Sequence, residues 1–210
     1  MVYYCLVKRI LAHFKKADPK IYEQIQKIIV IEGSNSLAIK TNDEGLFVSL
    51  CASIINQQLS NKAAATIFGR FKSLFLKGKI TPEKLAKMTP EKLRTVGISN
   101  QKANYLRDLA LKVNLKEVEL EKFADLSDEV IIKELTLVKG IGRWTAEMFL
   151  MFALGREDVF SYGDLILRKS VQKLYGFKKE PTAEEVDKII VKWSPYKTYA
   201  SRVLWRSYRL

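Results

Sequence analysis

Much of the structural information in this chain lies in one segment, Leu135-Thr136-Leu137-Val138-Lys139-Gly140-Ile141-Gly142-Arg143-Trp144-Thr145-Ala146. Ser127 precedes two acidic residues that suit the first turn of a helix leading into this segment. Two glycines one residue apart then favour a tight turn, because glycine adopts backbone angles that other residues avoid. A second helix is expected from Arg143 to Leu154. The pattern predicts two helices joined by a Gly-x-Gly turn.

The predicted turn suits an anion. The first amide groups of a helix lack partners within it, so N–H groups at the start of the second helix point outward. Lys139 and Arg143 flank the turn and add positive charge. A phosphate diester fits such a site, and this kind of contact positions DNA without reading its sequence. An ordinary connection between two packed helices is the alternative that Gly-x-Gly alone leaves open.

A second informative segment runs from Asp158 to Lys169 and contains Asp164 where a new helix is expected to begin. Asp164 is therefore either a helix N-cap or a functional carboxylate. A helix N-terminus keeps a carboxylate ionised. An ionised, partly enclosed Asp can stabilise the positive sugar that forms when a base leaves, or activate an attacking water.

The rest of the chain predicts an all-α fold of about ten helices with short connections. Ser60 and Thr182 are suited to cap helices, and Pro82 and Pro90 occupy first helical positions. Weak strand patterns occur only at residues 28–31 and 37–39.

We expect the helices to form two lobes with a cleft between them, a usual place for a site. One lobe is expected from residues 1–45 and 127–210, which include the Gly-x-Gly turn and Asp164. Residues 46–126 are expected to form the middle lobe.

Composition limits the class of protein and of partner. The 210 residues include 36 Lys and Arg against 23 Asp and Glu, and the net charge of +13 favours nucleic acid or another anionic surface. No apolar run approaches the roughly 18 residues of a membrane span, and the start resembles no signal peptide, so we expect an intracellular protein without a membrane partner. Two cysteines and one histidine are too few for a four-ligand zinc site or a four-thiolate iron–sulfur cluster.

Five segments in this order resemble the helix-hairpin-helix (HhH-GPD) DNA glycosylase superfamily, and within it the 3-methyladenine DNA glycosylase II (AlkA-like) branch. They are His13-Phe14 with Asp18-Pro19, Ile54 to Ala64, Leu93 to Ser99 with Lys102-Ala103, the Gly-x-Gly segment followed by Asp164, and Trp193 to Ala200. The resemblance covers about His13 to Trp205. It implies a two-lobed glycosylase fold in a compact form, without the additional N-terminal domain of longer relatives.

The resemblance implies roles for single residues. Asp164 lies at the family's catalytic aspartate position. Trp144 lies where bifunctional members carry a lysine that forms a Schiff base and cuts the strand, so an enzyme with Trp there is expected to lack AP-lyase activity. In this branch Trp144 would line the base pocket, where an indole attracts a cationic alkylated purine; a buried core aromatic is the alternative. Further pocket candidates are Met148, Trp193 and Tyr196, for which a structural role is the alternative.

The segment Gln57-Gln58-Leu59 resembles the loop that fills the gap left by a flipped nucleotide. Either Gln58 would hydrogen-bond the orphaned base or Leu59 would wedge into the base stack, and the sequence does not decide between them. A turn that only links two helices is the alternative. The expected DNA contacts are Gln57, Gln58, Leu59, Ser60, Val138, Lys139, Gly140, Ile141, Gly142, Arg143 and Thr145. The resemblance implies no organic cofactor, but a Na⁺ or K⁺ ion held by the backbone of Thr136, Val138 and Ile141.

The combined expectation is a monofunctional glycosylase that excises alkylated purines, of the 3-methyladenine and 7-methylguanine type, from double-stranded DNA. It would act as a monomer in the cytoplasm or nucleoid of a prokaryote or the nucleus of a eukaryote. One alternative keeps the class and changes the lesion to a deaminated base, an etheno adduct or uracil. The others are a non-catalytic HhH DNA-binding module, which would need neither Asp164 nor the Gln57–Leu59 loop, and an RNA-binding helical protein.

Overall fold

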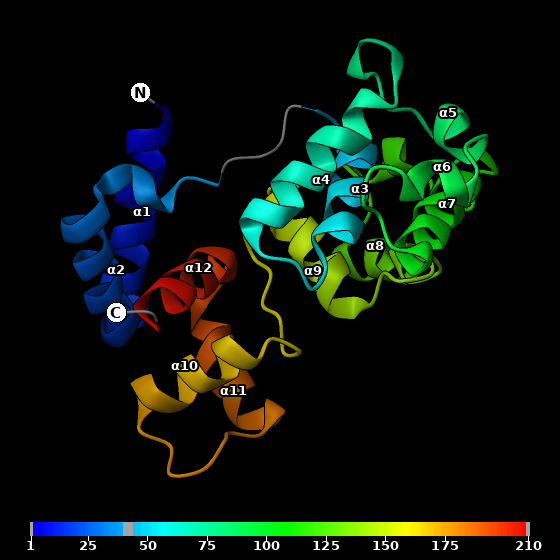
Figure 1. Ribbon diagram of the computed structural model, residues 1–210. Helices are drawn as coiled ribbons and strands as arrows, with labels where there is room; N and C mark the ends of the chain where they lie inside the picture. The colour runs from blue at the N-terminus through cyan, green and yellow to red at the C-terminus, as the bar shows by residue number, and fades with distance from the viewer. Residues whose placement is uncertain (1, 40–43, 209–210) are drawn as a thin grey trace. The chain divides into compact units, whose positions relative to one another are not determined.

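The computed structural model describes residues 2–39 and 44–208, and within them the fold is all-α, as predicted. Twelve α-helices and four short 3₁₀ helices are present, with no strand in these ranges (Figure 1). Residues 28–31, whose pattern hinted at a strand, form the end of α2 (Pro19–Glu32), so helical packing prevails over the local preference of this Ile- and Val-rich run. No helix in the described residues is long and apolar enough to cross a membrane.

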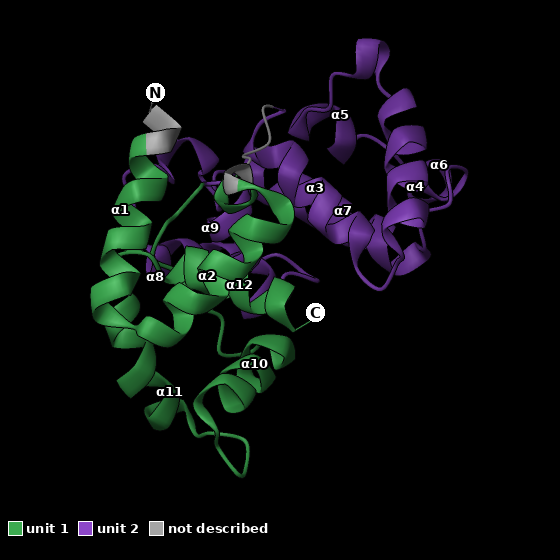
Figure 2. Ribbon diagram, turned by 90° about the vertical axis from the view of Figure 1, so that its left-hand side faces the viewer, with its two compact units in different colours: residues 1–40, 155–210 green, residues 41–154 purple. Residues whose placement is uncertain are grey.

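The chain divides into two compact units (Figure 2). Unit 1 contains residues 1–40 and 155–210, and unit 2 contains residues 41–154. The predicted division differs, because it assigned residues 127–154 to the other lobe. These residues belong to unit 2 since α8 (Asp128–Leu135) packs against α9 (Arg143–Phe152), which packs in turn against α3 (Leu46–Asn56).

Unit 1 is built from two distant parts of the chain. Its central contacts are those of α12 with α2 and α10, and of α1 with α2. The elements are α1 (Val2–Ala17), α2, η1 (Ser34–Leu37), α10 (Leu165–Tyr175), α11 (Ala183–Ile190), η4 (Val191–Trp193) and α12 (Lys197–Ser207).

A buried carboxylate ties these parts of unit 1 together. Asp18 caps α2 by accepting from the Ile21 amide at 3.3 Å. Its other oxygen accepts from the Tyr175 hydroxyl at 2.5 Å and from the Trp193 indole N–H at 2.9 Å. Burial, together with the Asp18 carboxylate, raises the pKa of Tyr175, so this phenol stays protonated and remains a donor.

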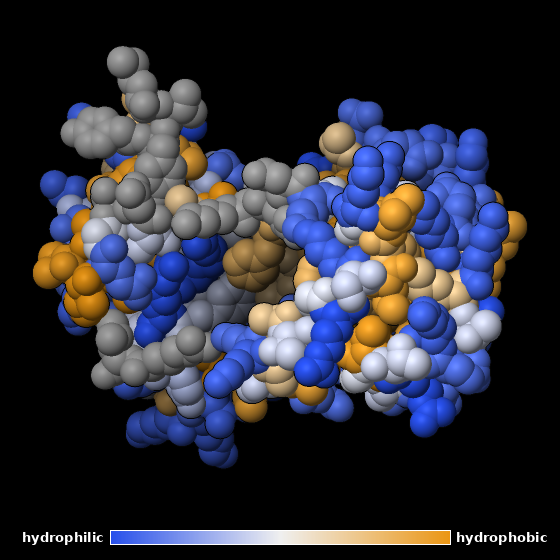
Figure 3. Space-filling model, turned by 45° about the horizontal axis from the view of Figure 1, so that its top comes forward, coloured by the Kyte–Doolittle hydropathy of each residue, from blue (hydrophilic) through white to orange (hydrophobic). Residues whose placement is uncertain are grey.

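Unit 2 is organised around α7 (Asn100–Asn114), which packs against α3, α5 (Pro82–Ala86) and α6 (Pro90–Arg94). Its other elements are α4 (Asn61–Ser73), η2 (Leu76–Gly78), η3 (Leu120–Lys122), α8 and α9. Hydrophilic residues cover much of the face of unit 2 drawn in Figure 3, interrupted by a hydrophobic strip.

Local capping explains where several helices begin. The Ser60 side chain accepts from the Ala63 amide and starts α4, and Thr182 with Glu185 forms a complete capping box at α11. Pro82 and Pro90 open α5 and α6 directly after capping threonines. These four predictions are confirmed.

Candidate functional site

The segment 135–146 forms two helices joined by a tight turn, as predicted. α8 ends at Leu135 and α9 begins after Gly142, while the Ile141 amide donates to the Val138 carbonyl at 3.1 Å. Val138 and Ile141 are buried, whereas Lys139 and Gly142 are exposed. The first turn of α9 has neither an acidic residue nor a side-chain cap at Gly142. This end of the helix therefore favours an anion.

The turn is held by side chains from outside it. Gly140 has φ +84° and lies against the Tyr105 ring, where an added Cβ would stand 2.1 Å from Tyr105 Cδ2. The Lys139 amide donates to Asp108 Oδ2 at 2.8 Å, and Gln57 Nε2 donates to the Gly140 carbonyl at 2.7 Å. The turn is thus fixed by α7 and by the loop after α3.

That loop, residues 57–60, connects α3 to α4. Gln58 has φ +57°, a left-handed backbone uncommon outside glycine, and its side chain is exposed. Leu59 is half-buried, and its amide donates to the Asn56 carbonyl at 3.2 Å. The left-handed backbone of Gln58 is of interest because strained non-glycine residues concentrate at functional sites. The side chain of Gln57 has a structural role, since it donates to the Gly140 carbonyl, besides any contact with DNA.

A pocket of about 490 Å³ lies in unit 2 between this loop and the start of α9. It brings together Trp144 and Met148 with Gln57 and Gln58, all selected from the sequence. Trp144 is 47% exposed, so it is not a buried core aromatic. The lining residues are Ser53, Asn56, Gln57, Gln58, Trp144, Thr145 and Met148, none of them ionisable.

Ser53 and Asn56 line this pocket although the sequence analysis did not select them. Their spacing of three residues at the end of α3 places them on one side of that helix, directly before the loop. That spacing is the signal that would have found them.

Two predicted pocket residues lie in unit 1. Trp193 is 0% exposed, its indole N–H donates to Asp18, and its ring packs edge-on against Phe160 with the ring centroids 5.8 Å apart. Trp193 therefore belongs to the core and cannot line an open pocket, which corrects the prediction. Tyr196 is half-buried, with its ring 5.3 Å from that of His13. Its predicted role stays a prediction.

Asp164 is the N-cap of α10 and is 9% exposed. Its Oδ1 accepts from the Leu167 amide at 2.9 Å and from the Trp205 indole N–H at 3.0 Å. Both donors stabilise a negative charge on the carboxylate and fix its orientation. Trp205 follows Asp164 by 41 residues in the chain, and no local pattern marks this pairing.

Arg143, expected beside a phosphate, is bound by two carboxylates. Its Nη2 and Nη1 donate to Glu129 at 2.5 and 3.1 Å, and its Nε donates to the buried Glu147 at 2.9 Å. The hydrogen bond with Glu129 is the main reason that the pKa of Arg143 is raised and that of Glu129 lowered. Much of the positive charge that the sequence placed at the turn is therefore compensated within the protein.

The described residues contain no group of three or more His, Cys, Asp or Glu side chains placed to hold a metal ion. The Na⁺ or K⁺ ion expected at the turn would instead be held by backbone oxygens, and it stays a prediction. The Val138 carbonyl accepts from Ile141, while within the described residues no hydrogen bond is seen to the carbonyls of Thr136 and Ile141. Carbonyl oxygens are suitable donors for such hard cations.

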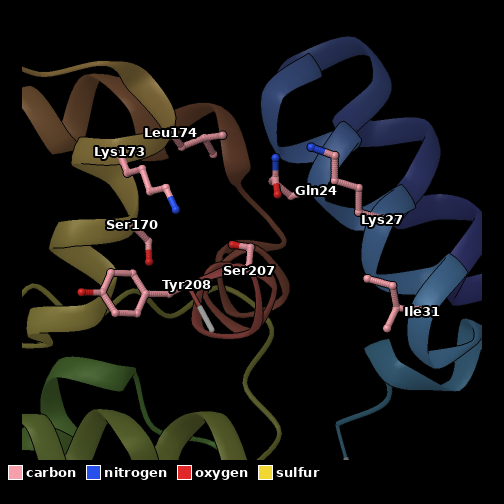
Figure 4. Close-up of a pocket in the computed structure, with 8 residues that line it drawn as sticks. All are labelled: Gln24, Lys27, Ile31, Ser170, Lys173, Leu174, Ser207 and Tyr208. Atoms are coloured by element: carbon pink, nitrogen blue, oxygen red, sulfur yellow. The ribbon is translucent and has the colours of Figure 1, made fainter. Parts of the chain in front are cut away.

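A separate pocket of about 470 Å³ lies in unit 1 between α2, α10 and α12 (Figure 4). Lys27 and Lys173 give it a positive lining, and it contains none of the residues selected from the sequence.

The chain thus combines an all-α fold, two helices joined by a glycine turn and an N-capping aspartate on a later helix. Residues 51–195 match the HhH-GPD superfamily of base excision DNA repair proteins, and the chain belongs to this superfamily.

Named relatives give a finer comparison. The chain is 37% identical over 166 residues to DNA-3-methyladenine glycosylase 1 of Schizosaccharomyces pombe, an alignment covering 78% of this chain and 73% of that protein. It is 31% identical over 178 residues to the DNA-3-methyladenine glycosylase of Saccharomyces cerevisiae, covering 80% of this chain and 60% of the relative.

Solved structures agree with this comparison. The S. pombe 3-methyladenine DNA glycosylase in complex with abasic DNA has a TM-score of 0.76 and 31% identity, covering 96% of this chain and 97% of that one. The DNA-3-methyladenine glycosidase of Bacillus halodurans has a TM-score of 0.74 and 34% identity, covering 88% of each chain.

Proposed function

We propose that this protein is a DNA glycosylase that excises alkylated purines, of the 3-methyladenine and 7-methylguanine type, from double-stranded DNA as a monomer. One observation carries the proposal: the exposed indole of Trp144 lines a pocket whose lining residues are all uncharged. A cationic purine is attracted to an indole face and meets no competing charge there. The names of the relatives support the same substrate class.

The proposed chemistry needs few groups, because an alkylated purine with positive charge is already a good leaving group. As the N-glycosidic bond breaks, positive charge develops on the sugar. Asp164 stabilises this charge as a carboxylate and assists the attack of water. Leu167 and Trp205 hold the carboxylate in a fixed orientation through their N–H groups.

The proposed handling of DNA divides between two elements of unit 2. The Gly140–Gly142 turn and Lys139 bind backbone phosphate, assisted by a monovalent cation at the turn carbonyls. Gln58 and Leu59 enter the gap that the flipped nucleotide leaves, and no organic cofactor is required. Trp144, which lines the pocket, lies at the position where bifunctional members of the superfamily carry a lysine, and its indole cannot form a Schiff base, which supports base release without strand cleavage.

A wider range of bases is a second candidate function. Asn56 brings an amide group into the pocket, and the Ser53 hydroxyl, which donates to the Ser49 carbonyl at 2.9 Å, brings an acceptor oxygen; such groups hydrogen-bond neutral bases. Duplexes with hypoxanthine or an etheno adduct test this range beside methylated DNA.

The central experiment measures base release from duplex DNA treated with a methylating agent, with released bases identified by chromatography. We expect wild type to release methylated purines and to leave strands intact until alkali or heat is applied. Asp164→Asn should lower the rate by about 10² or more while the new amide still caps α10. Trp205→Phe, which keeps a ring but removes the donor, should cause a smaller loss.

Asp125→Asn is the matched control, since it makes the same change at an exposed loop position. Duplex binding by wild type without release of any base would contradict the glycosylase proposal. Strand cleavage without alkali would contradict the absence of lyase activity.

A further inference from the structure

Lys102, near the start of α7, makes contacts that the reaction described above does not use. Its Nζ donates to the carbonyl of Ile55 at 2.9 Å and to that of Gln57 at 2.5 Å. These carbonyls lie at and just after the end of α3, where helix carbonyls lack partners and the helix dipole is negative. Lys102 is half-buried, and desolvation by the surrounding protein lowers the pKa of its ammonium.

Through these bonds Lys102 fixes the residue that precedes the exposed tip of the loop. The carbonyl of Gln57 is held by Lys102, and its side-chain amide is held by Gly140. Gln58 then follows with φ +57°. A left-handed conformation of a non-glycine residue persists only where its surroundings impose it, and the two anchors of Gln57 supply that constraint.

The same helix also fixes the Gly140–Gly142 turn. The Tyr105 ring lies against Gly140, and Asp108 accepts from the Lys139 amide. Lys102, Tyr105 and Asp108 follow one another at intervals of three residues, so each lies beside the next on the surface of α7. One rigid helix therefore contacts both the loop and the turn.

We propose that Lys102 is a positioning residue, which holds Gln58 and Leu59 in the conformation that enters duplex DNA at a fixed spacing from the phosphate-binding turn. The proposal rests on the proposed function in one respect, the entry of the loop into DNA. Lys102 itself contacts neither base nor sugar in this proposal.

Lys102→Met keeps an unbranched side chain one atom shorter than lysine and removes both charge-assisted hydrogen bonds, while Tyr105 and Asp108 still hold the turn. In the DNA-free protein, hydrogen exchange in residues 55–60 should accelerate by about tenfold or more, with α7 and α9 unchanged. Lys112→Met is the matched control, because Lys112 lies ten residues further along the same helix and its ammonium donates to Glu117 at 3.1 Å.

A second readout follows the loop into DNA without requiring catalysis. The probe is a duplex with a tetrahydrofuran abasic analogue opposite 2-aminopurine, whose fluorescence changes when a side chain enters the gap. At saturating protein, Lys102→Met should lose about half or more of the wild-type change, with its Kd for the duplex within about threefold because phosphate contacts remain. Lys102→Arg, which retains two donors, should recover much of the signal.

The outcomes separate the possible roles. Faster exchange with an unchanged fluorescence signal would reduce Lys102 to a helix cap and overturn the proposal, as would wild-type behaviour of Lys102→Met in both readouts. If Lys102→Met fails to fold, Lys102→Arg and Lys102→Gln are compared instead, and equal fluorescence signals from these two variants would overturn the proposal.

A wild-type protein that gives no fluorescence change would remove the role of the loop itself. Normal loop entry without release of methylated bases would contradict the glycosylase proposal and leave the positioning role standing.

Discussion

The two glycines of the turn differ in what surrounds them. Gly140 has φ +84°, and its missing side chain is replaced by the ring of Tyr105. Gly142 has an ordinary φ of −91°, and a Cβ added there would meet nothing within 4 Å. The packing of Tyr105 therefore requires a glycine at position 140, whereas the open space beside Gly142 leaves room for a bound molecule.

Alanine at each position should separate these two reasons. Gly140→Ala combines backbone strain with a steric clash, and should lower the free energy of unfolding by about 1–3 kcal/mol. Gly142→Ala should lower it by less than about 1 kcal/mol and weaken duplex binding, because the methyl group obstructs a phosphate backbone. Urea unfolding and fluorescence anisotropy with a labelled duplex measure the two effects. Unchanged duplex affinity in Gly142→Ala would argue against backbone contact at this glycine.

At the scale of elements, the ion pair of Arg143 with Glu129 links α9 to α8, and this link limits the positive charge at the turn. The lowered pKa of Glu129 keeps its carboxylate ionised at neutral pH, so the pair persists there and is lost only as pH falls through that lowered value. Arg143 therefore meets an incoming phosphate with Glu129 already bound.

Glu129→Gln should release part of that charge. We expect the Kd for duplex DNA to tighten by about threefold at low salt, with the gain shrinking as salt rises. Stability should change by less than about 1 kcal/mol, because the pair is exposed. Glu119→Gln, which breaks the exposed pair with Lys122, is the control for a change of net charge alone. An equal gain in both variants would show that the position of Glu129 is unimportant.

Elements and contacts differ in how far the sequence predicts them. Ser60, Thr182 and the prolines after Thr81 and Thr89 act within one helical turn, so local pattern finds the helices they start. The contact of Gln57 with Gly140 joins residues 83 apart, and that of Trp205 with Asp164 joins residues 41 apart. Such pairs depend on packing, which a single sequence does not display. The predicted boundary at residue 127 differs from the observed division at residue 154 for the same reason, because the packing of α9 against α3 decides it.

At the scale of the whole molecule, the two units differ in how they use the chain. Unit 2 is one continuous segment with its own core, which includes Leu50, Leu106 and Phe149. Unit 1 requires both the first 40 residues and those after 154, since α12 packs against α2 and α10. The elements proposed to bind phosphate, enter the duplex and stack on the base all belong to unit 2. The carboxylate proposed for the chemistry, Asp164, belongs to unit 1.

This division predicts that binding and base release are separable. Residues 41–154 expressed alone should unfold cooperatively and bind duplex DNA with a salt-dependent affinity, whose log–log slope is about −0.9 per phosphate neutralised. They should release no base, because they lack Asp164. Circular dichroism, anisotropy at several salt concentrations and chromatography of released bases measure the three properties. Excision by this segment alone would place the essential carboxylate in unit 2 and remove Asp164 from the mechanism, whereas a folded segment that does not bind duplex would move the main phosphate contacts out of the turn.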